Sequence, residues 1–561
     1  MGGGSAQAAE HVSAAKAQAR SCHERYLGAT KSTDITRTTA ASTGLVRARL
    51  AGRGDWDVAV FDARTHRTVA GSAGFGAREL AEGFVRKGQR LLVQACRYRG
   101  GAKGAELGVS YLGIDGGAKA ATAGGKIQVV DVATHDQAEK RRLQDLGLDL
   151  TEHGDADSVE VVLHGDADEQ KLRDAGFSWE VRIADLVARS KANRAADRRF
   201  AADVEQTALP SGSTSYRRLA DYELQMKELA ARYPSMVKPV TLAETTLEGR
   251  PVNGIEITRN ADDIQDGKPT FLMMGVHHAR EWPSSEHAIE FAYDLLTNYG
   301  KSARTTRLVN ATRTIVVPIV NVDGFNLSRE APDDSGAGFA YKRKNCRVTD
   351  GQPPAPGACG LQVNRNRGVD PNRNYGGLWG GQGASVNPLS DTYRGAGPFS
   401  EPETRNIQKL VSGRQVTNLI TNHTYGNLTL RPPGLVAQGP PIDEPAYRAL
   451  GERLTDHNLY ANMPSYGLYD TSGTTEDWSY YATGGWGFTF EIGPDEFHPP
   501  YEQGVVDEYL GRGDVAGAGK GGNREAYYEM LESTADAGMH SLLTGKAPKG
   551  STITLRKQFQ T

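Results

Sequence analysis

The feature that most constrains this chain is an apolar run that stops at a glycine. Side chains of the types that bind metals follow it at once. Residues 270–274 are Thr-Phe-Leu-Met-Met, Gly275 ends the run, and His278 and Glu281 follow three residues apart. Such a short run bounded by glycine predicts a buried strand, with both side chains at its mouth. His423 follows a second apolar run, 416–420. Two imidazoles and a carboxylate are the three protein ligands of a catalytic zinc, which leaves its fourth position open.

The His-x-x-Glu pair alone is a weak signal, because this spacing is common by chance. His277 breaks the three-residue spacing to Glu281, so we interpret it as a packing residue or as support for a ligand. Asp323, in an Asn-Val-Asp-Gly turn, is interpreted as structural. Further motifs in a fixed order strengthen the metal hypothesis: Tyr341-Lys342-Arg343-Lys344, Asp370-Pro371-Asn372-Arg373-Asn374-Tyr375, Asn422-His423-Thr424-Tyr425, Tyr469, and the strand 487–491 that ends at Glu491.

With these motifs, the stretch from about Tyr216 to Leu543 resembles the zinc metallocarboxypeptidases of the carboxypeptidase A/B family. The resemblance implies one Zn²⁺ held by His278, Glu281 and His423, and hydrolysis of the C-terminal peptide bond of peptides and proteins. It also implies an α/β fold, a mixed and mostly parallel sheet with helices on both faces. Strand-like runs that alternate with helix-like stretches such as 284–296 and 401–413 agree with that fold class.

The resemblance assigns the reaction chemistry to two further residues. A bound zinc would be the Lewis acid that polarises the peptide carbonyl and acidifies a water. Glu491, at the end of an apolar strand, matches the general base that takes the water's proton and returns it to the leaving amine. Arg343 matches the arginine that stabilises the oxyanion.

Substrate binding is assigned in the same way. Asn372 and Arg373 match the receptor for the substrate's terminal carboxylate, which a guanidinium fork can bind through both oxygens. Tyr469 matches the tyrosine that closes over the bound end, and Tyr425 and Arg280 match further substrate-contacting positions.

Glu476 falls at the floor of the pocket for the released side chain. A buried carboxylate there favours a cation, so we expect release of basic C-terminal residues, with apolar ones also tolerated. The family's usual floor residue for this preference is Asp rather than Glu. The residues expected to form the pocket walls are Thr421, Leu430, Gly434, Pro464, Thr471 and Thr489.

Composition excludes some classes of function. The chain has 561 residues and a net charge of −3, which gives no reason to expect nucleic acid as a partner. No run of 18 apolar residues exists, so no membrane partner is expected. Four cysteines allow three pairings, and we expect disulfides between Cys22 and Cys96 and between Cys346 and Cys359. The second pair resembles the family's disulfide loop, and an even cysteine count favours a secreted, extracellular protein.

The N-terminal part divides into several predicted regions. Residues 1–43 form a segment whose start resembles a cloning remnant or a replaced leader, and no signal peptide is recognisable. Short β-forming runs separated by glycines predict a β-sandwich over 44–117, similar to pre-peptidase domains. Residues 118–125 are expected to be a linker.

Residues 126–188 show a strand-helix-strand-strand-helix-strand order, which predicts a small ferredoxin-like α+β domain. In front of this family's enzyme it resembles the pro-domain that caps the active site. Residues 189–215 are expected to be a connecting helix and linker, where Arg194, Arg198 and Arg199 would be cut by an activating protease. We therefore expect a zymogen. The zinc carboxypeptidase domain spans 216–545, and the tail 546–561 could add one strand over 552–555.

Three other readings stay open. The same fold could hydrolyse bacterial wall peptides or another non-standard substrate, although such relatives tend to lack the full carboxylate receptor. An inactive relative that only binds C-terminal tails would have lost Glu491 or a ligand, and none is missing. A non-enzymatic adhesion protein would rest only on the sandwich and on two Arg-Gly-Asp triplets.

Overall fold

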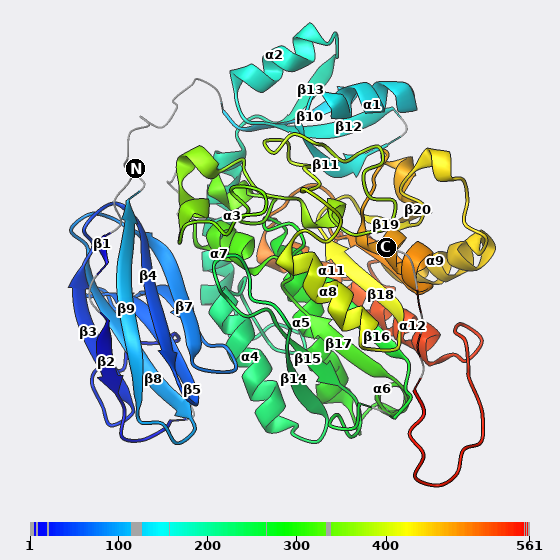
Figure 1. The fold of residues 1–561 in the computed structure, drawn as a ribbon. Coiled ribbons are helices and arrows are strands. Elements are labelled where there is room, and N and C mark those ends of the chain that lie inside the picture. The colour runs from blue at the N-terminus through cyan, green and yellow to red at the C-terminus, as the bar shows by residue number, and fades with distance from the viewer. Residues whose placement is uncertain are drawn as a thin grey trace.

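The protein is described by a computed structural model for residues 5–6, 9–18, 22–113, 126–155, 157–264, 266–331, 338–554, 556 and 558. A β-sandwich, a small α+β unit and a large α/β domain follow one another along the chain, and the α+β unit lies above one edge of the α/β domain (Figure 1). The predicted linker 118–125 lies outside the described residues. The described tail, 546–554, forms no strand, unlike the one considered over 552–555.

The N-terminal sandwich (described residues between 5 and 113) consists of two antiparallel sheets whose inner faces form one apolar core. One sheet has the order β1-β9-β4-β7 with β2 also on β9, and the other β3-β8-β5-β6. The strands are β1 (Ser5–Ala6), β2 (Glu10–Ser13), β3 (Thr33–Thr39), β4 (Gly44–Gly52), β5 (Asp55–Asp62), β6 (Thr68–Ser72), β7 (Arg78–Val85), β8 (Arg90–Arg99) and β9 (Gly104–Gly113).

The sandwich begins before residue 44, where the sequence placed its start. Strand β3 pairs with β8 along its whole length, and β2 pairs with β9. Both strands are rich in Thr, Ser and charged residues, because they lie at sheet edges and bury few side chains. Edge strands of this kind carry too little hydrophobic alternation to be recognised from sequence.

The small α+β unit (residues 126–183) has the strand and helix order that the sequence indicated. Its sheet has the order β11-β12-β10-β13, and every neighbouring pair is antiparallel. The elements are β10 (Gln128–Ala133), α1 (Gln137–Asp145), β11 (Asp149–Gly154), β12 (Ser158–Leu163), α2 (Asp166–Asp174) and β13 (Trp179–Ile183). Helix α3 (Leu186–Asp203) then connects it to the α/β domain, with Asp185 as the N-cap that accepts from Ala188 N at 2.9 Å.

The α/β domain (residues 216–539) contains an eight-stranded sheet of order β14-β15-β17-β16-β18-β21-β19-β20. Four neighbouring pairs are parallel and three are antiparallel, so the sheet is mixed. The strands are β14 (Val237–Thr241), β15 (Asn253–Ile257), β16 (Thr270–Gly275), β17 (Arg313–Val317), β18 (Val416–His423), β19 (Leu428–Arg431), β20 (Ala461–Pro464) and β21 (Trp486–Glu491).

Helices pack around this sheet as predicted for the fold class (Figure 1). The longer ones are α4 (Leu219–Arg232), α5 (Trp282–Asn298), α6 (Ala303–Ala311), α7 (Val322–Glu330), α8 (Pro402–Ser412), α9 (Glu444–Asn458) and α12 (Gly522–Ala535), and the short turns α10 (Thr475–Asp477) and α11 (Glu508–Leu510) complete the set.

Alternation along β18 divides its side chains between two faces of the sheet. Asn418 and Asn422 both face α12. Asn418 donates to Ser533 Oγ at 3.1 Å, and Asn422 accepts from the Tyr527 hydroxyl at 2.7 Å. Side chains of a strand alternate between its two faces, so His423, one residue after Asn422, points to the opposite face. The central parallel strands β16, β18 and β21 therefore present their last residues at one edge of the sheet.

Candidate active site

The three predicted metal ligands converge on one point inside the α/β domain. His278 Nδ1 lies 2.7 Å from Glu281 Oε1 and 3.1 Å from His423 Nδ1, and His423 Nδ1 lies 3.0 Å from Glu281 Oε2. All three side chains are buried. Donor atoms around a tetrahedral Zn²⁺ with bonds of about 2.0–2.1 Å stand roughly 3.3 Å apart, so a small outward movement would accommodate the ion. Two imidazole nitrogens turned toward each other beside a carboxylate fit a cation.

Hydrogen bonds on the far side of each imidazole direct its Nδ1 toward this point. His278 Nε2 lies 3.1 Å from Asp370 Oδ1, and His423 Nε2 lies 3.1 Å from Thr421 Oγ1. A carboxylate behind a histidine holds the proton on the outer nitrogen and leaves the inner nitrogen free to bind metal. Asp370 was not assigned a role from the sequence, although it begins the Asp-Pro-Asn-Arg motif.

His277 supports the site without facing its centre. Its Nε2 lies 2.8 Å from the Tyr375 hydroxyl and its Nδ1 lies 2.9 Å from Thr421 Oγ1, so both ring nitrogens have partners. The His277 ring stacks on the His423 ring with centroids 5.5 Å apart. The interpretation of His277 as a supporting residue therefore agrees with the geometry.

The turn after β16 is tightly specified by the backbone around it. A Cβ atom at Gly275 would lie 2.7 Å from Pro318 O and 2.8 Å from Ser284 O, so no larger residue fits. Val276 adopts φ +51°, an unfavourable region for a β-branched residue. The Val276 amide donates to Ser284 Oγ at 3.0 Å, which helps to hold this backbone conformation. The turn connects β16 to α5, and His278 and Glu281 lie in it.

Glu491 ends β21 directly beside the ligand His423, with which it is in register on the neighbouring parallel strand. The Glu491 carboxyl is buried, and its Oε2 has no hydrogen-bond partner. Burial and the nearby Glu152 and Glu281 carboxylates raise the pKa of Glu491 well above its ordinary value, against the opposing effect of Arg343. A buried carboxyl without a hydrogen-bond partner is costly to keep, and a strongly shifted pKa beside this cluster marks Glu491 as a candidate functional group.

Arg343 lies between the ligands and the α+β unit. Its Nε and Nη2 donate to Asp370 Oδ2 at 3.1 and 3.0 Å, and its Nη1 donates to Glu152 of β11. Despite the desolvation of burial, Asp370 and Glu152 hold the pKa of Arg343 above its ordinary value. The same Asp370 carboxylate therefore positions both a metal ligand and this cation.

Three other predicted substrate-binding residues also contact the α+β unit. Arg280 donates to both carboxylate oxygens of Asp149, at 2.6 and 2.8 Å. The Tyr469 hydroxyl donates to Thr151 O at 3.0 Å. The Tyr425 hydroxyl donates to Glu160, with burial as the main cause that raises the Glu160 pKa to about 7. None of these contacts could be predicted from sequence, because each joins residues that lie more than 100 positions apart.

Arg373 and Asn372 are held close together but keep donors free. Arg373 donates from Nε to Gly383 O at 3.1 Å and from Nη1 to Asn372 O at 2.9 Å, and it forms no ion pair with any described residue. The Asn372 side-chain oxygen accepts from Thr475 N at 3.0 Å and from Thr475 Oγ1 at 2.9 Å. This leaves the Asn372 amide nitrogen and a buried, unpaired guanidinium, the groups that a carboxylate needs.

Glu476 is buried among polar side chains. It accepts from Ser465 Oγ at 3.0 Å and from Thr489 Oγ1 at 3.1 Å. A Cβ at Gly434 would lie 2.4 Å from Thr471 Oγ1, so these two predicted wall residues are in close contact. No cation faces Glu476 among the ion pairs of the described residues, which leaves its charge open to a ligand.

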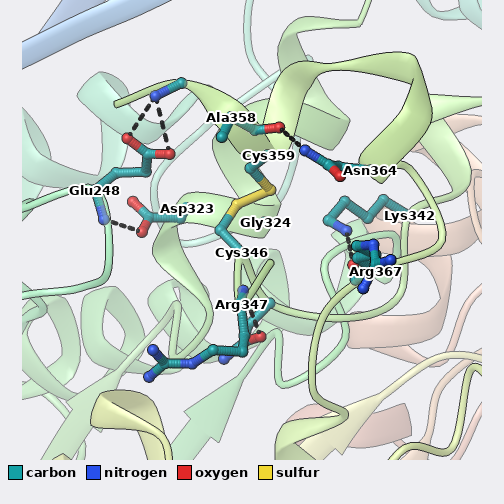
Figure 2. The surroundings of a disulfide bond; sticks show 12 residues. Glu248, Asp323, Gly324, Lys342, Cys346, Arg347, Ala358, Cys359, Asn364 and Arg367 are labelled. Carbon is teal, nitrogen blue, oxygen red and sulfur yellow. Dashed lines mark hydrogen bonds between the residues drawn. A yellow bond between two sulfur atoms is a disulfide. The ribbon is translucent and has the colours of Figure 1, made fainter. Parts of the chain in front are cut away.

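Both expected disulfides are present. Cys22 bonds Cys96 within the sandwich, with Cα atoms 5.6 Å apart, and Cys346 bonds Cys359 with Cα atoms 5.1 Å apart. Figure 2 shows the second bond beside Glu248 and Asp323. Asp323 accepts from Arg250 Nη1 at 2.7 Å, which agrees with the structural role expected for it.

Two other clusters of described residues could geometrically approach a metal, but existing partners neutralise them. In the cluster Asp131, His153 and Glu160, Arg182 lies 3.0 Å from Glu160. In the cluster Asp149, His164 and Asp391, Arg280 occupies Asp149. The cluster at His278 contains no such arginine between its donor atoms.

Among the described residues, no helix combines the length and apolar character needed to cross a bilayer.

Comparison with known proteins agrees with this geometry. Residues 222–505, just over half of the chain, match the zinc carboxypeptidase family model, so the chain belongs to that family. It is 28% identical over 291 residues to carboxypeptidase A2 of Rattus norvegicus, which covers 51% of this chain and 64% of that protein. The chain thus spans just under two thirds of that relative's length.

Two further likenesses bear on function and fold. A relative named inactive metallocarboxypeptidase ecm14, of Talaromyces stipitatus, is 33% identical over 184 residues, 32% of this chain and 28% of that protein. The crystal structure of carboxypeptidase A from Helicoverpa armigera superposes with a TM-score of 0.59 at 20% identity, covering 73% of this chain and 98% of that one. At that identity the superposition shows a shared fold.

Proposed function

We propose that the protein is a secreted zinc-dependent metallocarboxypeptidase that removes single residues from the C-termini of peptides and proteins. The observation that carries this proposal is the convergence of His278, Glu281 and His423, with Glu491 in register beside His423. An unpaired, buried Arg373 lies in the same site. Two disulfides support an oxidising, extracellular location.

In the proposed mechanism, one Zn²⁺ held by the three ligands supplies Lewis acidity at the scissile carbonyl. Glu491 takes a proton from the attacking water and delivers it to the leaving amine. Arg343 donates hydrogen bonds to the oxyanion that develops on the carbonyl oxygen. Asn372 and Arg373 bind the terminal carboxylate, and Tyr469 covers it, which restricts cleavage to the last peptide bond.

We further propose that residues 126–183 are a ferredoxin-like pro-domain and that the chain is a zymogen. The contacts that support this occupy the very residues that substrate would need: Arg343 by Glu152, Arg280 by Asp149, Tyr425 by Glu160 and Tyr469 by Thr151. The nearby Glu152 carboxylate also favours the protonated form of Glu491, in which it cannot act as a base. Exposed Arg198 and Arg199 near the end of α3 offer a cleavage site to an activating protease.

The proposed preference is for basic C-terminal residues, with apolar ones tolerated. Glu476 is buried and accepts only from hydroxyl groups, so a substrate ammonium or guanidinium would supply the missing positive charge. Apolar residues are tolerated in this proposal because the hydroxyls of Ser465 and Thr489 already solvate the carboxylate.

An inactive, tail-binding role is the second candidate, because the family includes a relative named inactive. The complete set of ligands, with Glu491 and Arg343 in place, favours the active candidate. Hydrolysis of bacterial wall peptides is disfavoured by the unpaired Arg373 beside Asn372, which is suited to a free α-carboxylate.

The test is amino-acid release from a mixed peptide pool, before and after limited trypsin digestion, with and without a chelator. We expect single C-terminal residues to appear after digestion and to disappear with chelator. His278→Ala should lose bound zinc, measured by metal analysis, whereas Glu491→Gln should keep the zinc and lose about 10²–10⁴-fold in kcat. A Glu491→Gln variant as active as the parent would refute the mechanism, and Glu502→Gln, an exposed glutamate, is the control.

A further inference from the structure

The N-terminal sandwich contacts the α/β domain through an apolar cluster centred on the disulfide loop. Leu45, Phe84 and Leu112 of the sandwich pack in one cluster with Leu327 and Phe339 and with the Cys346–Cys359 bond. Leu45 is buried, and a Cβ at Gly360 would lie 2.4 Å from Leu45 Cδ1. The sandwich and the loop are therefore packed as closely as a protein interior.

Buried charges on both sides of this contact are paired across it. Arg47 lies 2.9 Å from Glu248 and 3.2 Å from Glu82, and Arg250 lies 3.3 Å from Glu82 and 2.7 Å from Asp323. Arg47 and Glu82 belong to the sandwich, and the other three belong to the α/β domain (Glu248 and Asp323 in Figure 2). Glu248 also accepts from Gly357 N at 2.9 Å, inside the disulfide loop.

Helix α4 provides a second set of paired charges. Lys227 donates to Asp55 and to Asp57 of β5 at 2.7 Å each. Glu223 accepts from Ala73 N at 2.8 Å, and Asp221 lies 2.8 Å from His23. Lys227 and Asp57 are both buried, so separating the two domains would expose a charged pair that the contact now shields from solvent.

The two N-terminal units therefore hold the α/β domain in different ways. The α+β unit is held by Arg280, Arg343, Tyr425 and Tyr469, which the proposed reaction requires to be free. The sandwich contacts none of these residues through the interactions described, and it binds α4, α7 and the disulfide loop instead. An interface that combines buried apolar packing with ion pairs between buried side chains is typical of permanent complexes.

We propose that the sandwich is a permanent part of the mature enzyme, bound non-covalently after cleavage near Arg198, and that it braces the loop between Arg343 and Arg373. This inference rests on the proposed zymogen function. The brace acts through Leu45 and Arg47, which hold Gly357–Gly360 and the disulfide against α7. That loop connects the oxyanion arginine to the carboxylate receptor, so its position sets the distance between the two subsites.

The test starts from Asp149→Asn/Glu152→Gln, which weakens binding of the α+β unit by two contacts and leaves the sandwich intact, and the Lys227 variant described next then separates the contribution of the sandwich. The full chain is cut by limited trypsin digestion near Arg198 and passed through a size-exclusion column. We expect the N-terminal fragment to co-elute with the α/β fragment. Elution of the two fragments apart, with a stable α/β fragment, would overturn the proposal, and this readout requires no enzymatic activity.

A second variant tests the charged interface directly. Lys227→Met leaves Asp55 and Asp57 without their cation, so after cleavage we expect at least tenfold more free α/β fragment than in the parent background. Adding Asp55→Asn and Asp57→Asn should restore co-elution, because removing both partners of a buried pair is far less harmful than removing one. Lys301→Met, at an exposed lysine, is the matched control. Unchanged co-elution in Lys227→Met would argue against the proposal.

Bracing is measured by the reactivity of the Cys346–Cys359 bond, since both cysteines are buried under the sandwich. With dithiothreitol and a thiol label read by mass spectrometry, we expect this bond to be reduced at least tenfold faster in the separated α/β fragment than in the complex. Equal rates would show that the sandwich binds without bracing the loop. Loss of enzymatic activity in every sample would instead contradict the proposed function and leave both of these readouts intact.

Discussion

Glu152 on β11 and Arg343 form a buried ion pair at the reaction site, and the same guanidinium lies 3.0 Å from Asp370 Oδ2. Asp370 in turn lies 3.1 Å from the ligand His278. One carboxylate of the α+β unit thus reaches the polar network that orders the proposed metal site. In the proposed zymogen, Glu152 would supply to Arg343 the negative charge that the oxyanion supplies during the reaction.

Glu152→Gln should therefore raise the activity of the uncut chain. Removing one partner of a buried pair costs about 3–5 kcal/mol, but other contacts, among them Arg280 with Asp149 and Arg141 with Asp470, still hold the α+β unit, so we expect an increase of about tenfold. Activity after trypsin digestion should be unchanged, because the cut allows the α+β unit to leave the site while the sandwich stays bound. Initial rates on one peptide before and after digestion measure both values. Glu180→Gln, at an exposed position of the same unit, should change neither.

Latency should also weaken as pH rises. Burial raises the pKa of Glu160 to about 7 in the docked state, above the ordinary value of about 4.3 that it regains when released. Docking therefore takes up a proton, so its stabilisation is complete below the ordinary pKa and is lost as pH rises through about 7. Within that window, the docking constant should fall by up to tenfold per pH unit.

The ratio of activity in uncut and cut enzyme, measured from pH 5 to pH 8, reports this change. The ratio should increase with pH in the parent and stay nearly flat in Glu160→Gln, whose side chain cannot ionise. The ratio cancels any pH dependence of the reaction itself. A ratio that falls with pH would contradict the assignment of Glu160.

Local sequence signals were sufficient for the ligand strands and insufficient for the contacts between units. The run 270–274 ends one residue before the end of β16, and the run 416–420 lies inside β18 and begins at the same residue. Both were recognisable because parallel, buried strands are apolar over most of their length. Motif order then located the residues that meet at the sheet edge. In contrast, β2 and β3 are polar edge strands with no clear alternation, and the sandwich boundary was placed too late.

The contacts of Asp149, Glu152 and Glu160 could not be found from sequence for a different reason. Each is an acidic residue on a strand, and nothing local distinguishes a solvated carboxylate from one that meets an arginine or a tyrosine more than 100 residues away. Asp370 is an intermediate case. It stands inside a recognised motif, but its bonds to both His278 and Arg343 depend on tertiary structure.

Arg373 should determine the requirement for a free C-terminus. Arg373→Gln removes the unpaired guanidinium, so we expect kcat/KM on a peptide with a free α-carboxylate to fall by about 10²–10³-fold, since a charged hydrogen-bonded pair lost from a buried site costs about 2–5 kcal/mol. Zinc content should remain that of the parent. An amidated peptide, a poor substrate in both, should be cleaved at an unchanged rate. Arg448→Gln, 62% exposed, is the control.

Glu476 should determine the choice between basic and apolar C-terminal residues. Its carboxylate accepts only from Ser465 and Thr489, so a substrate guanidinium would be its sole cationic partner. We expect Glu476→Gln to lower kcat/KM for a peptide ending in Arg by about 10²-fold, and to change that for the matched peptide ending in Phe by less than about threefold, because an apolar side chain makes no use of the charge. If the parent already preferred Phe strongly, or if the variant lost both substrates equally, Glu476 would be a structural residue and the pocket floor would lie elsewhere.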